Sequence, residues 1–488
     1  MLPPIHLDPQ SSEPLYRQLY RNLRDLIDSG QFDKGARLPA TRELAGQLGL
    51  NRTTISAAYE LLESEGLITG HVGRGSFVAG SSNSSSAFEW RDILKEPPSS
   101  APATSPAVRI SFATSRPSEL LFPLEDFRAT CEEVIHGADA HTILQLGSPS
   151  GYAPLRRYLI DKSRTEGVAE EADDIVITSG VQQAFDLLQR TLAADGETVL
   201  IEDPVYSGLR NVFQRGGARM VGLPVGPHGL ELGALERAMA KERPRLLVVT
   251  SNFQNPTGAT LPLASRKAIL ALAQRFGVII IENDIYGPLC YEGDPIATIK
   301  QLDDSGHTVL LRSFSKLAFP GLRVGWAIAP RALIEKLTEA KQISDLHTDQ
   351  LSQAVLLRFA ESGRLENHRT LMLTAGRERL RATLAACEKY LPEGAAYTRP
   401  RGGMNLWIRL PQPLDAGELL ARAERVGVTY LPGRYFAVTN MEASALRISF
   451  AGLAPDLIKT GLSVLGRIFQ EGLERTRSQS RLEVPAMV

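Results

Sequence analysis

The chain is short of cysteine, with three in 488 residues: Cys131, Cys290 and Cys387. The three lie far apart, and neither they nor the eight histidines follow the spacing of a metal site. An odd number of isolated thiols argues against a disulfide framework and is typical of a protein in a reducing compartment. We therefore expect a cytoplasmic protein without a bound metal.

Long apolar runs are also missing. No stretch of about 18 apolar residues occurs, so neither a membrane span nor a membrane partner is expected. The first residues, MLPPIHLDPQ, lack the charged and apolar regions of a signal peptide. A net charge of -1 excludes a polycation, so any contact with nucleic acid has to come from a local patch. At 488 residues, 43% of them hydrophobic, the chain is expected to form two or three globular domains.

One segment, residues 80–107, is rich in Ser, Pro and Ala and has few consecutive apolar residues. This composition is typical of a linker. The linker divides the chain into a compact unit at 13–79 and a much longer one at 108–470.

The N-terminal unit shows three helical patterns and then a hairpin pattern. Apolar residues recur at helical spacing in PLYRQLYRNLRDLIDSG, a second helix is expected in TRELAGQLGL, and a third follows the capping residue Asn51 in NRTTISAAYELLESEG. LITGHVGRGSFVA alternates around a glycine-rich tip. Helix, helix, turn, helix and hairpin form the α+β layout of a winged helix-turn-helix.

In such a fold the N-terminal residues of the third helix meet base edges in the major groove. Here they are Arg52, Thr53 and Thr54, while Arg42 is placed to contact phosphate and Arg74 to enter the minor groove. Eight basic and eight acidic residues leave this unit without net charge, so a helical docking module is the alternative. The run LPATRELAGQLGLNRTTISAAYELLESEGLITGHVGRGSFVA resembles the GntR-family winged helix, which implies double-stranded operator DNA as a partner.

After the linker, Val/Ile/Leu-rich segments alternate with amphipathic ones. Strands are expected in DIVITS, TVLIED, RLLVVTS, GVIIIEND, TVLLRSF and RVGWAIA, with helices such as VQQAFDLLQRTL between them. Near-continuous apolar strands predict the buried, mostly parallel sheet of an α/β domain. Long helices then precede the strands GGMNLWIRL and LRISFAG. We expect a large lobe at 108–334 and a smaller C-terminal α+β lobe at 335–470.

Lys316 lies in the apolar stretch RSFSKLAFPGLRVGW. Desolvation favours the neutral amine, which is the nucleophile that forms a Schiff base. A surface lysine with a buried stem is the alternative. Pyridoxal phosphate, a Schiff-base cofactor, also needs a cation, hydroxyl groups and the backbone N–H groups of a helix start around its phosphate. The residues placed for that role are Gly180, Val181, Gln182, Ser313, Ser315 and Arg323.

The ring of this cofactor needs further partners. A carboxylate keeps the pyridine nitrogen protonated, so that the ring works as an electron sink, and Asp284 ends a strand, where α/β sheets place ligand contacts. Asn255 of QNPTG and Tyr286 of DIY are placed to contact the phenolic oxygen, and Tyr206 of EDPVY to cover the ring. Alone, NPTG is an ordinary turn and a strand-ending Asp is a cap. Their order and spacing together predict a pyridoxal phosphate site.

Over about residues 110–470 the chain resembles the fold-type I aminotransferases. The resemblance implies a role for each predicted residue: Lys316 is the aldimine lysine, Asp284 the partner of the pyridine nitrogen, Asn255 and Tyr286 the phenolate ligands, and Arg323 the phosphate arginine.

Two further positions bear on this resemblance. Arg447 of LRISFAG matches the arginine that holds a substrate carboxylate, for which a forked guanidinium is suited; a surface ion pair is the alternative. The chain departs from the family at Leu146, where a tyrosine commonly reaches across the dimer to the phosphate.

A GntR-type winged helix joined to an aminotransferase-like domain resembles the MocR/GabR family of bacterial transcription regulators. This resemblance implies a head-to-tail homodimer that binds a promoter operator. It also implies sensing of pyridoxal phosphate, or of an amine or amino acid that forms an external aldimine with it, with at most half-transamination. A working aminotransferase that carries a winged helix is the main alternative, because it uses the same Lys316. A cofactor-binding scaffold that has lost both functions is the other.

Overall fold

The computed structural model describes residues 5–79 and 108–482, with gaps at 9–10, 12, 34, 72–74, 194 and 440. The chain forms two compact units, residues 1–97 and 98–488. The predicted linker and Arg74 lie outside the described residues. Among the helices that are described, none is both long enough and apolar enough to cross a lipid bilayer.

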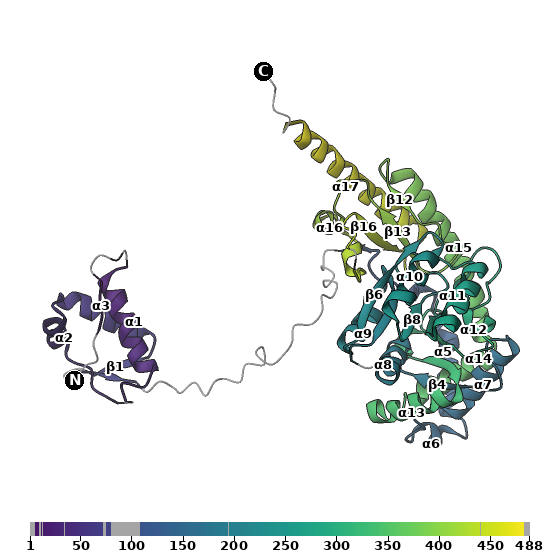
Figure 1. The fold of residues 1–488 in the computed structure, drawn as a ribbon, viewed down its shortest axis with the longest axis horizontal. Coiled ribbons are helices and arrows are strands. Elements are labelled where there is room, and N and C mark those ends of the chain that lie inside the picture. The colour runs from purple at the N-terminus through teal and green to yellow at the C-terminus, as the bar shows by residue number, and fades with distance from the viewer. Residues whose placement is uncertain are drawn as a thin grey trace. The chain divides into compact units, whose positions relative to one another are not determined.

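The N-terminal unit is a three-helix bundle with a two-stranded antiparallel hairpin, drawn in purple in Figure 1. Leu19, Leu23 and Ile27 form the buried face of the first helix, as their spacing predicts. Asn51 caps the third helix, because its side chain accepts a hydrogen bond from the Thr53 N–H at 3.2 Å. The elements are α1 (Leu15–Asp28), α2 (Thr41–Leu48), α3 (Arg52–Ser64), β1 (Ile68–His71) and β2 (Gly75–Val78).

The second unit is built on an eight-stranded sheet of order β4-β11-β10-β9-β8-β5-β6-β7. The five strands from β10 to β6 are parallel, whereas β11 and β7 are antiparallel to their neighbours. The strands are β4 (Asp173–Thr178), β5 (Thr198–Asp203), β6 (Arg219–Gly226), β7 (Gly229–Leu230), β8 (Leu246–Val249), β9 (Ile279–Asn283), β10 (Thr308–Ser313) and β11 (Gly325–Pro330).

Helices cover both faces of this sheet, as expected for apolar parallel strands. One face packs on α8 (Val181–Leu192), α9 (Ser207–Arg215) and α13 (Arg331–Asp345), and is called the α8 face below. The opposite face, the α11 face, packs on α7 (Ala153–Thr165), α10 (Leu232–Glu242), α11 (Leu263–Phe276), α12 (Ile299–Leu302) and α14 (Gln350–Glu361).

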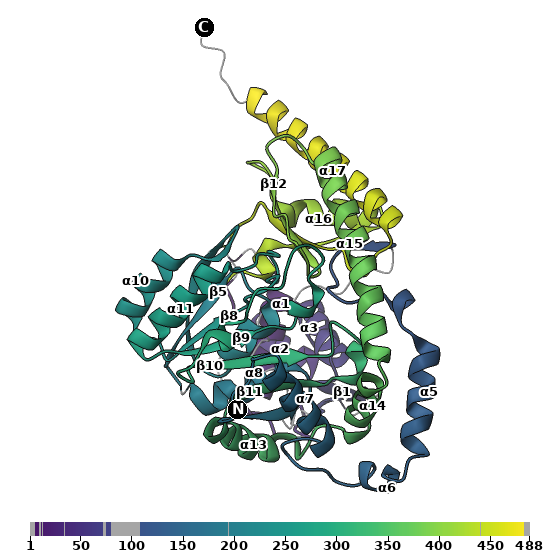
Figure 2. The ribbon, with the colours of Figure 1, turned by 90° about the vertical axis from the view of Figure 1, so that its right-hand side faces the viewer.

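The smaller lobe is a four-stranded antiparallel sheet covered by helices. The sheet comprises β12 (Ala396–Tyr397), β13 (Asn405–Arg409), β16 (Ala445–Ser449) and β15 (Leu431–Pro432). Figure 2 shows α15 (Arg364–Tyr390) and α17 (Pro455–Leu482) side by side along it, with α16 (Ala416–Arg425) nearby. Apolar residues of both lobes meet in one core cluster that includes Phe253, Tyr286 and Leu406.

The expected lobe boundary at 334/335 differs from this packing. The helices α13 and α14 follow that boundary but pack on the large sheet. Conversely, β3 (Ile110–Ser111) precedes the large sheet in sequence but pairs with β14 (Val428–Thr429) of the small lobe. The remaining described elements are η1 (Glu119–Leu121), α5 (Leu124–Ile135), α6 (Ala140–Ile143), η2 (Gly287–Leu289), η3 (Pro320–Leu322) and η4 (Gly433–Tyr435).

Candidate functional site

Lys316 lies in the loop between β10 and β11 and reaches toward residues from other parts of the chain. Its Nζ donates to the backbone oxygen of Ser115 at 2.8 Å and lies 5.7 Å from the centre of the Tyr286 ring. No described carboxylate pairs with it. The amine is therefore held by a neutral acceptor that a ligand can displace, whereas the buried Lys300 and Lys341 are tied to Asp173 and Asp345.

Tyr286, Asn255 and Arg447 form a connected group beside Lys316. The Asn255 Nδ2 donates to the Tyr286 hydroxyl at 3.4 Å, and the Arg447 Nη1 donates to the Asn255 Oδ1 at 3.2 Å. The structure thus brings together four of the predicted residues from separate parts of the chain. Tyr286 and Asn255 are both buried, at 2% and 8% exposure, so their polar ends are held in place.

Arg447 is a buried cation without a described carboxylate partner. It is 3% exposed, its Nη2 donates to the Ala113 backbone oxygen, and its Nε has no described partner. Burial lowers the pKa of Arg447 to about 10, while Tyr286 and Tyr206 act in the opposite direction. A buried guanidinium that lacks an anion is costly, so this site favours an anionic ligand. The alternative of a surface ion pair is excluded.

The start of α8 and Arg323 form a cradle for a phosphate. Gly180 is the N-cap of α8 with φ 77°, and a side chain there would overlap the Arg323 guanidinium. Arg323 itself has φ 54° and donates from Nη1 to the Ser315 hydroxyl at 3.4 Å. The N–H groups of Val181 and Gln182 belong to the first turn, where a helix leaves N–H groups free for anions.

Two other predicted residues support this cradle. Ser313 Oγ bonds to the Val324 backbone oxygen and to the Ser315 hydroxyl, both at 2.9 Å, so it holds the loop that carries Arg323. Tyr206 is 45% exposed at the start of α9. Its pKa is raised by burial and by Tyr286, and is lowered by Arg447 and Arg323, so Tyr206 shares their electrostatic environment.

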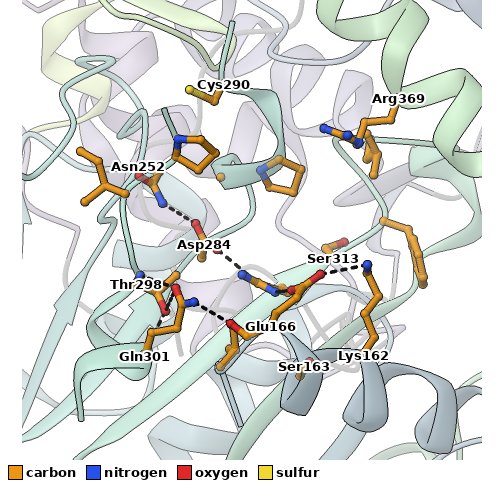
Figure 3. A pocket seen from close by; sticks show the side chains of 18 of the residues that line it. Lys162, Ser163, Glu166, Asn252, Asp284, Cys290, Thr298, Gln301, Ser313 and Arg369 are labelled. Atoms are coloured by element: carbon orange, nitrogen blue, oxygen red, sulfur yellow. Dashed lines mark hydrogen bonds and ion pairs between the residues drawn. The ribbon is translucent and has the colours of Figure 1, made fainter. Parts of the chain in front are cut away.

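Both carboxylate oxygens of Asp284 are engaged by other side chains, which differs from the role predicted from the sequence. Its Oδ1 accepts from the Asn252 Nδ2 at 2.7 Å, and its Oδ2 pairs with the Arg312 Nε at 3.1 Å. Arg312 also pairs with Glu166 on α7, at 3.2 Å. Figure 3 shows this network in a cavity lined by Lys162, with Lys316 absent from its lining. The carboxylate therefore belongs to the α11 face.

Asn283, which was not predicted from the sequence, is the neighbouring polar residue and points to the α8 face. It is 8% exposed, and its Nδ2 donates to the Thr250 hydroxyl at 3.3 Å. Its Oδ1 has no partner among the described residues. The signal that identifies it is the strand alternation, since Ile281 and Asn283 point to one face while Glu282 points to the other.

The predicted DNA-reading residues are available on the surface of the N-terminal unit. Arg42, Arg52 and Thr53 are exposed and Thr54 is half-buried. Neither arginine forms an ion pair with a described residue. The acidic end of α3 is engaged elsewhere, because Glu63 accepts from the Gly70 N–H and Glu65 pairs with Arg24 on α1. These contacts leave the start of α3 unobstructed.

The chain matches two protein families in tandem. Residues 15–78 match the bacterial regulatory proteins of the gntR family, and residues 107–465 match the class I and II aminotransferases. It is 36% identical to a 2-aminoadipate transaminase of Thermus thermophilus, over 73% of this chain and 89% of that protein. Full-length relatives are the HTH-type transcriptional regulator YdfD of Bacillus subtilis, 30% identical over 94% and 97%, and the probable rhizopine catabolism regulatory protein MocR of Rhizobium meliloti, 27% identical over 95% of each.

The aminotransferase fold is confirmed by solved structures. Pyrococcus horikoshii kynurenine aminotransferase, in complex with PMP, has a TM-score of 0.76 and 31% identity, and covers 80% of this chain and 100% of that one. The chain belongs to the MocR-type transcriptional regulators. The regulator has a GntR winged helix for DNA and a fold-type I domain for pyridoxal phosphate. The residues fit that cofactor, because the Gly180–Arg323 cradle suits its phosphate and Asn283 offers an orphaned amide oxygen. Groups of metal-ligating residues are not found in the described ranges.

Leu146, the departure from the aminotransferases, lies after α6 with 74% of its surface exposed. It makes no described contact with the cradle.

Gly180→Ala tests the phosphate cradle. The added methyl group would overlap the Arg323 guanidinium and displace the cation, so we expect at least about tenfold weaker binding of pyridoxal phosphate, or about 1.4 kcal/mol. Equilibrium dialysis measures the dissociation constant. Gly167→Ala is the control, because Gly167 also has a positive φ, at 66°, with no atom within 4 Å of the new methyl group. Equal losses in both variants would contradict the assignment.

Proposed function

We propose that this regulator binds promoter DNA as a cytoplasmic homodimer and senses an amine that carries a carboxylate through pyridoxal phosphate. The winged helix at 13–79 is the DNA-reading part and residues 108–470 are the sensing part. The observation that carries the proposal is Arg447, a buried cation with no described anion, beside the displaceable amine of Lys316. Such a pair suits an amino acid, which presents a carboxylate and an amine.

The residues that would hold the cofactor come from four places in the chain. The N–H groups of Val181 and Gln182, with Arg323 and the Ser315 hydroxyl, would hold its phosphate. Asn255 and Tyr286 would contact its phenolic oxygen, and Tyr206 would cover one ring face. Pyridoxal phosphate supplies a carbonyl that bonds covalently to amines and a ring that withdraws electrons. Lys316 is the amine of this chain placed to attach to it.

The site also has a route to the DNA-reading part. Lys316 and Arg447 both donate to backbone oxygens of the segment at 113–115, which leads from the linker into the large unit. Attachment of the cofactor to Lys316 would remove the contact with Ser115, and a ligand carboxylate that reaches Arg447 would remove the contact with Ala113, so the ligand-bound and ligand-free forms differ in how this segment is held. That difference in binding energy is what a regulatory switch requires.

A working aminotransferase remains the rival function, since the 2-aminoadipate transaminase shares the fold. The winged helix and the full-length regulators of the same layout favour regulation. Sustained turnover near 1 per second with an amino donor and a keto acid is the result that would favour the enzyme.

Attachment of the cofactor to Lys316 is tested by reduction with borohydride and peptide mass spectrometry. We expect the label on Lys316 alone. The buried Lys300 and Lys341 are internal controls, because a carboxylate holds each of them at 2.9 and 2.6 Å. Lys316→Ala is expected to keep the fold and lose the label. A label on another lysine would overturn the assignment.

Recognition of DNA is tested by footprinting the regulator on its own promoter. Arg52→Ala is expected to lose about 1–3 kcal/mol of discrimination between sequences, while Arg42→Ala weakens binding to all sequences and lowers the salt slope by about one. Arg24→Ala is the matched control, because Arg24 pairs with Asp28 and Glu65 away from the start of α3.

The homodimer predicts two half-sites in the same footprint, since two linked domains gain from binding together. Scrambling one half-site should then reduce affinity strongly. Full affinity for a single half-site, or an unchanged sequence preference in Arg52→Ala, would contradict this interpretation.

The carboxylate preference is tested by titrating the cofactor-loaded regulator with amino acids and with the amines that lack their carboxylate. The absorbance of the cofactor reports binding. We expect the wild type to bind the amino acid more tightly and Arg447→Gln to lose about 10- to 100-fold of that preference, the scale of a charge-assisted pair. Arg409→Gln is the control, because Arg409 lies on the adjacent strand and pairs with Glu442 at the surface. Equal binding of both ligands by the wild type would refute the carboxylate assignment.

A further inference from the structure

We infer that Asn283, and not an acidic residue, faces the ring nitrogen of the bound cofactor, so that this nitrogen is held without a countercharge. The inference deepens the proposed function and rests on its cofactor site. It assigns to Asn283 the part that the sequence analysis gave to Asp284.

The first step is the alternation of side chains along β9. Ile281 packs in the core against α8, whereas Ile280 packs against α10 and α11. Glu282 continues the α11 face, where it accepts from the N–H groups of Ile299 and Lys300 at 2.9 Å. Asn283 therefore points to the α8 face, which also carries the phosphate cradle at the start of α8.

Neighbouring strands place Asn283 among the same residues. It pairs in register with Leu311 of β10, five residues before Lys316, and bonds to Thr250 at the end of β8, five residues before Asn255. The strands on both sides thus lead from Asn283 directly to the loops that hold Lys316 and Asn255. The orphaned Oδ1 of Asn283 lies at the carboxyl edge of the sheet, where α/β folds bind ligands.

Asp284 is held on the opposite face of the sheet by two side chains. Its two oxygens are used by Asn252 and Arg312, and Arg312 is tied in turn to Glu166. Moving the carboxylate to the α8 face would require a one-residue shift of the strand, which would turn Glu282 and Ile281 to the wrong faces as well. It would also take one of its two carboxylate partners from the half-buried Arg312.

The chemical consequence follows from the difference between an amide and a carboxylate. A carboxylate stabilises a protonated ring nitrogen by its charge, and the protonated ring is the stronger electron sink. An amide is neutral and offers both a donor and an acceptor. One Nδ2 hydrogen of Asn283 is used by Thr250, the second can bond to the unprotonated nitrogen, and Oδ1 can accept from a protonated one without the charge that would favour that proton. Asn283 thus lets the site hold the cofactor and capture an amine while withholding the charge that strengthens the later proton removal. This suits a sensor.

The test compares the holoproteins of Asn283→Asp and Asp284→Asn with the wild type, by the pH dependence of the cofactor absorbance and by cofactor dissociation. We expect Asn283→Asp to raise the pKa of the cofactor's ring nitrogen by more than one unit. It should also slow cofactor loss at least about tenfold, which is the equivalent of one pKa unit. Asp284→Asn should leave both quantities unchanged and lower only the stability of the fold, because it breaks the Arg312 pair.

The new buried carboxylate of Asn283→Asp can destabilise the protein without cofactor. Thermal unfolding, measured without and with cofactor, separates that effect from cofactor binding. Asn283→Asp should then melt below the wild type without cofactor and show the larger rise in melting temperature on adding it. Asn283→Ala adds no charge, so it should keep the wild-type pH dependence while losing cofactor faster. A chromophore that responds to Asp284→Asn and not to Asn283→Asp would overturn this inference but leave the proposed function standing. A wild type that takes up no cofactor would instead refute the proposed function and this inference with it.

Discussion

Side chains that follow one another along a strand point to opposite faces of the sheet, and this constraint separates two polar groups at the end of β9. On the α11 face, Asp284 is enclosed with Arg312 and Asn252 in an ion-paired network that contributes to the fold. On the α8 face, Asn283 stands with the loops that carry Lys316 and Asn255. Because neighbouring residues of a strand point to opposite faces, a substitution at 283 affects the α8 face and a substitution at 284 affects the ion-paired network of the α11 face.

The charges of the site follow from this separation. Lys316, Arg323 and Arg447 are brought to one region without an ion pair to any described carboxylate. The carboxylate that would have offset one of them is held by Arg312 on the other face. A phosphate and a ligand carboxylate are therefore the anions that balance these cations. A neutral residue at 283 keeps that balance without requiring a proton on the cofactor ring.

Much of this arrangement was predictable from the sequence, because motifs carry local chemistry. The strand-loop segments around Lys316, Asn255 and Arg447, the helix start at Gly180 and the N-cap Asn51 all lie where their patterns indicated. Motif spacing does not show to which face of the sheet a strand residue points. The run GVIIIEND ends in two polar residues, and the choice between them depends on which of Ile280 and Ile281 faces α8.

Local sequence patterns also did not predict which distant strands pair with each other. The strand β3 joins the small lobe only because β14, far along the chain, offers it a partner, and the composition of residues 108–112 carries no sign of that. The helices α13 and α14 look like the start of a new lobe because they are long. Their apolar faces nevertheless fit the large sheet, and packing decides where a helix belongs.

The position of β3 brings the segment that follows it into contact with two cations of the site. The residues just after β3 place the backbone oxygens of Ala113 and Ser115 on Arg447 and Lys316. A carbonyl is a weaker partner for a guanidinium than a carboxylate, which carries a full charge and two oxygens. A ligand carboxylate that reaches Arg447 would therefore replace the Ala113 oxygen as its partner. Attachment of Lys316 to the cofactor would remove the contact of Lys316 with the Ser115 oxygen. Both changes act on the same short segment, which directly follows β3. The two cations that hold the segment are thus the ones placed for the cofactor and for the ligand carboxylate, so each of the two binding events removes a different contact with the segment.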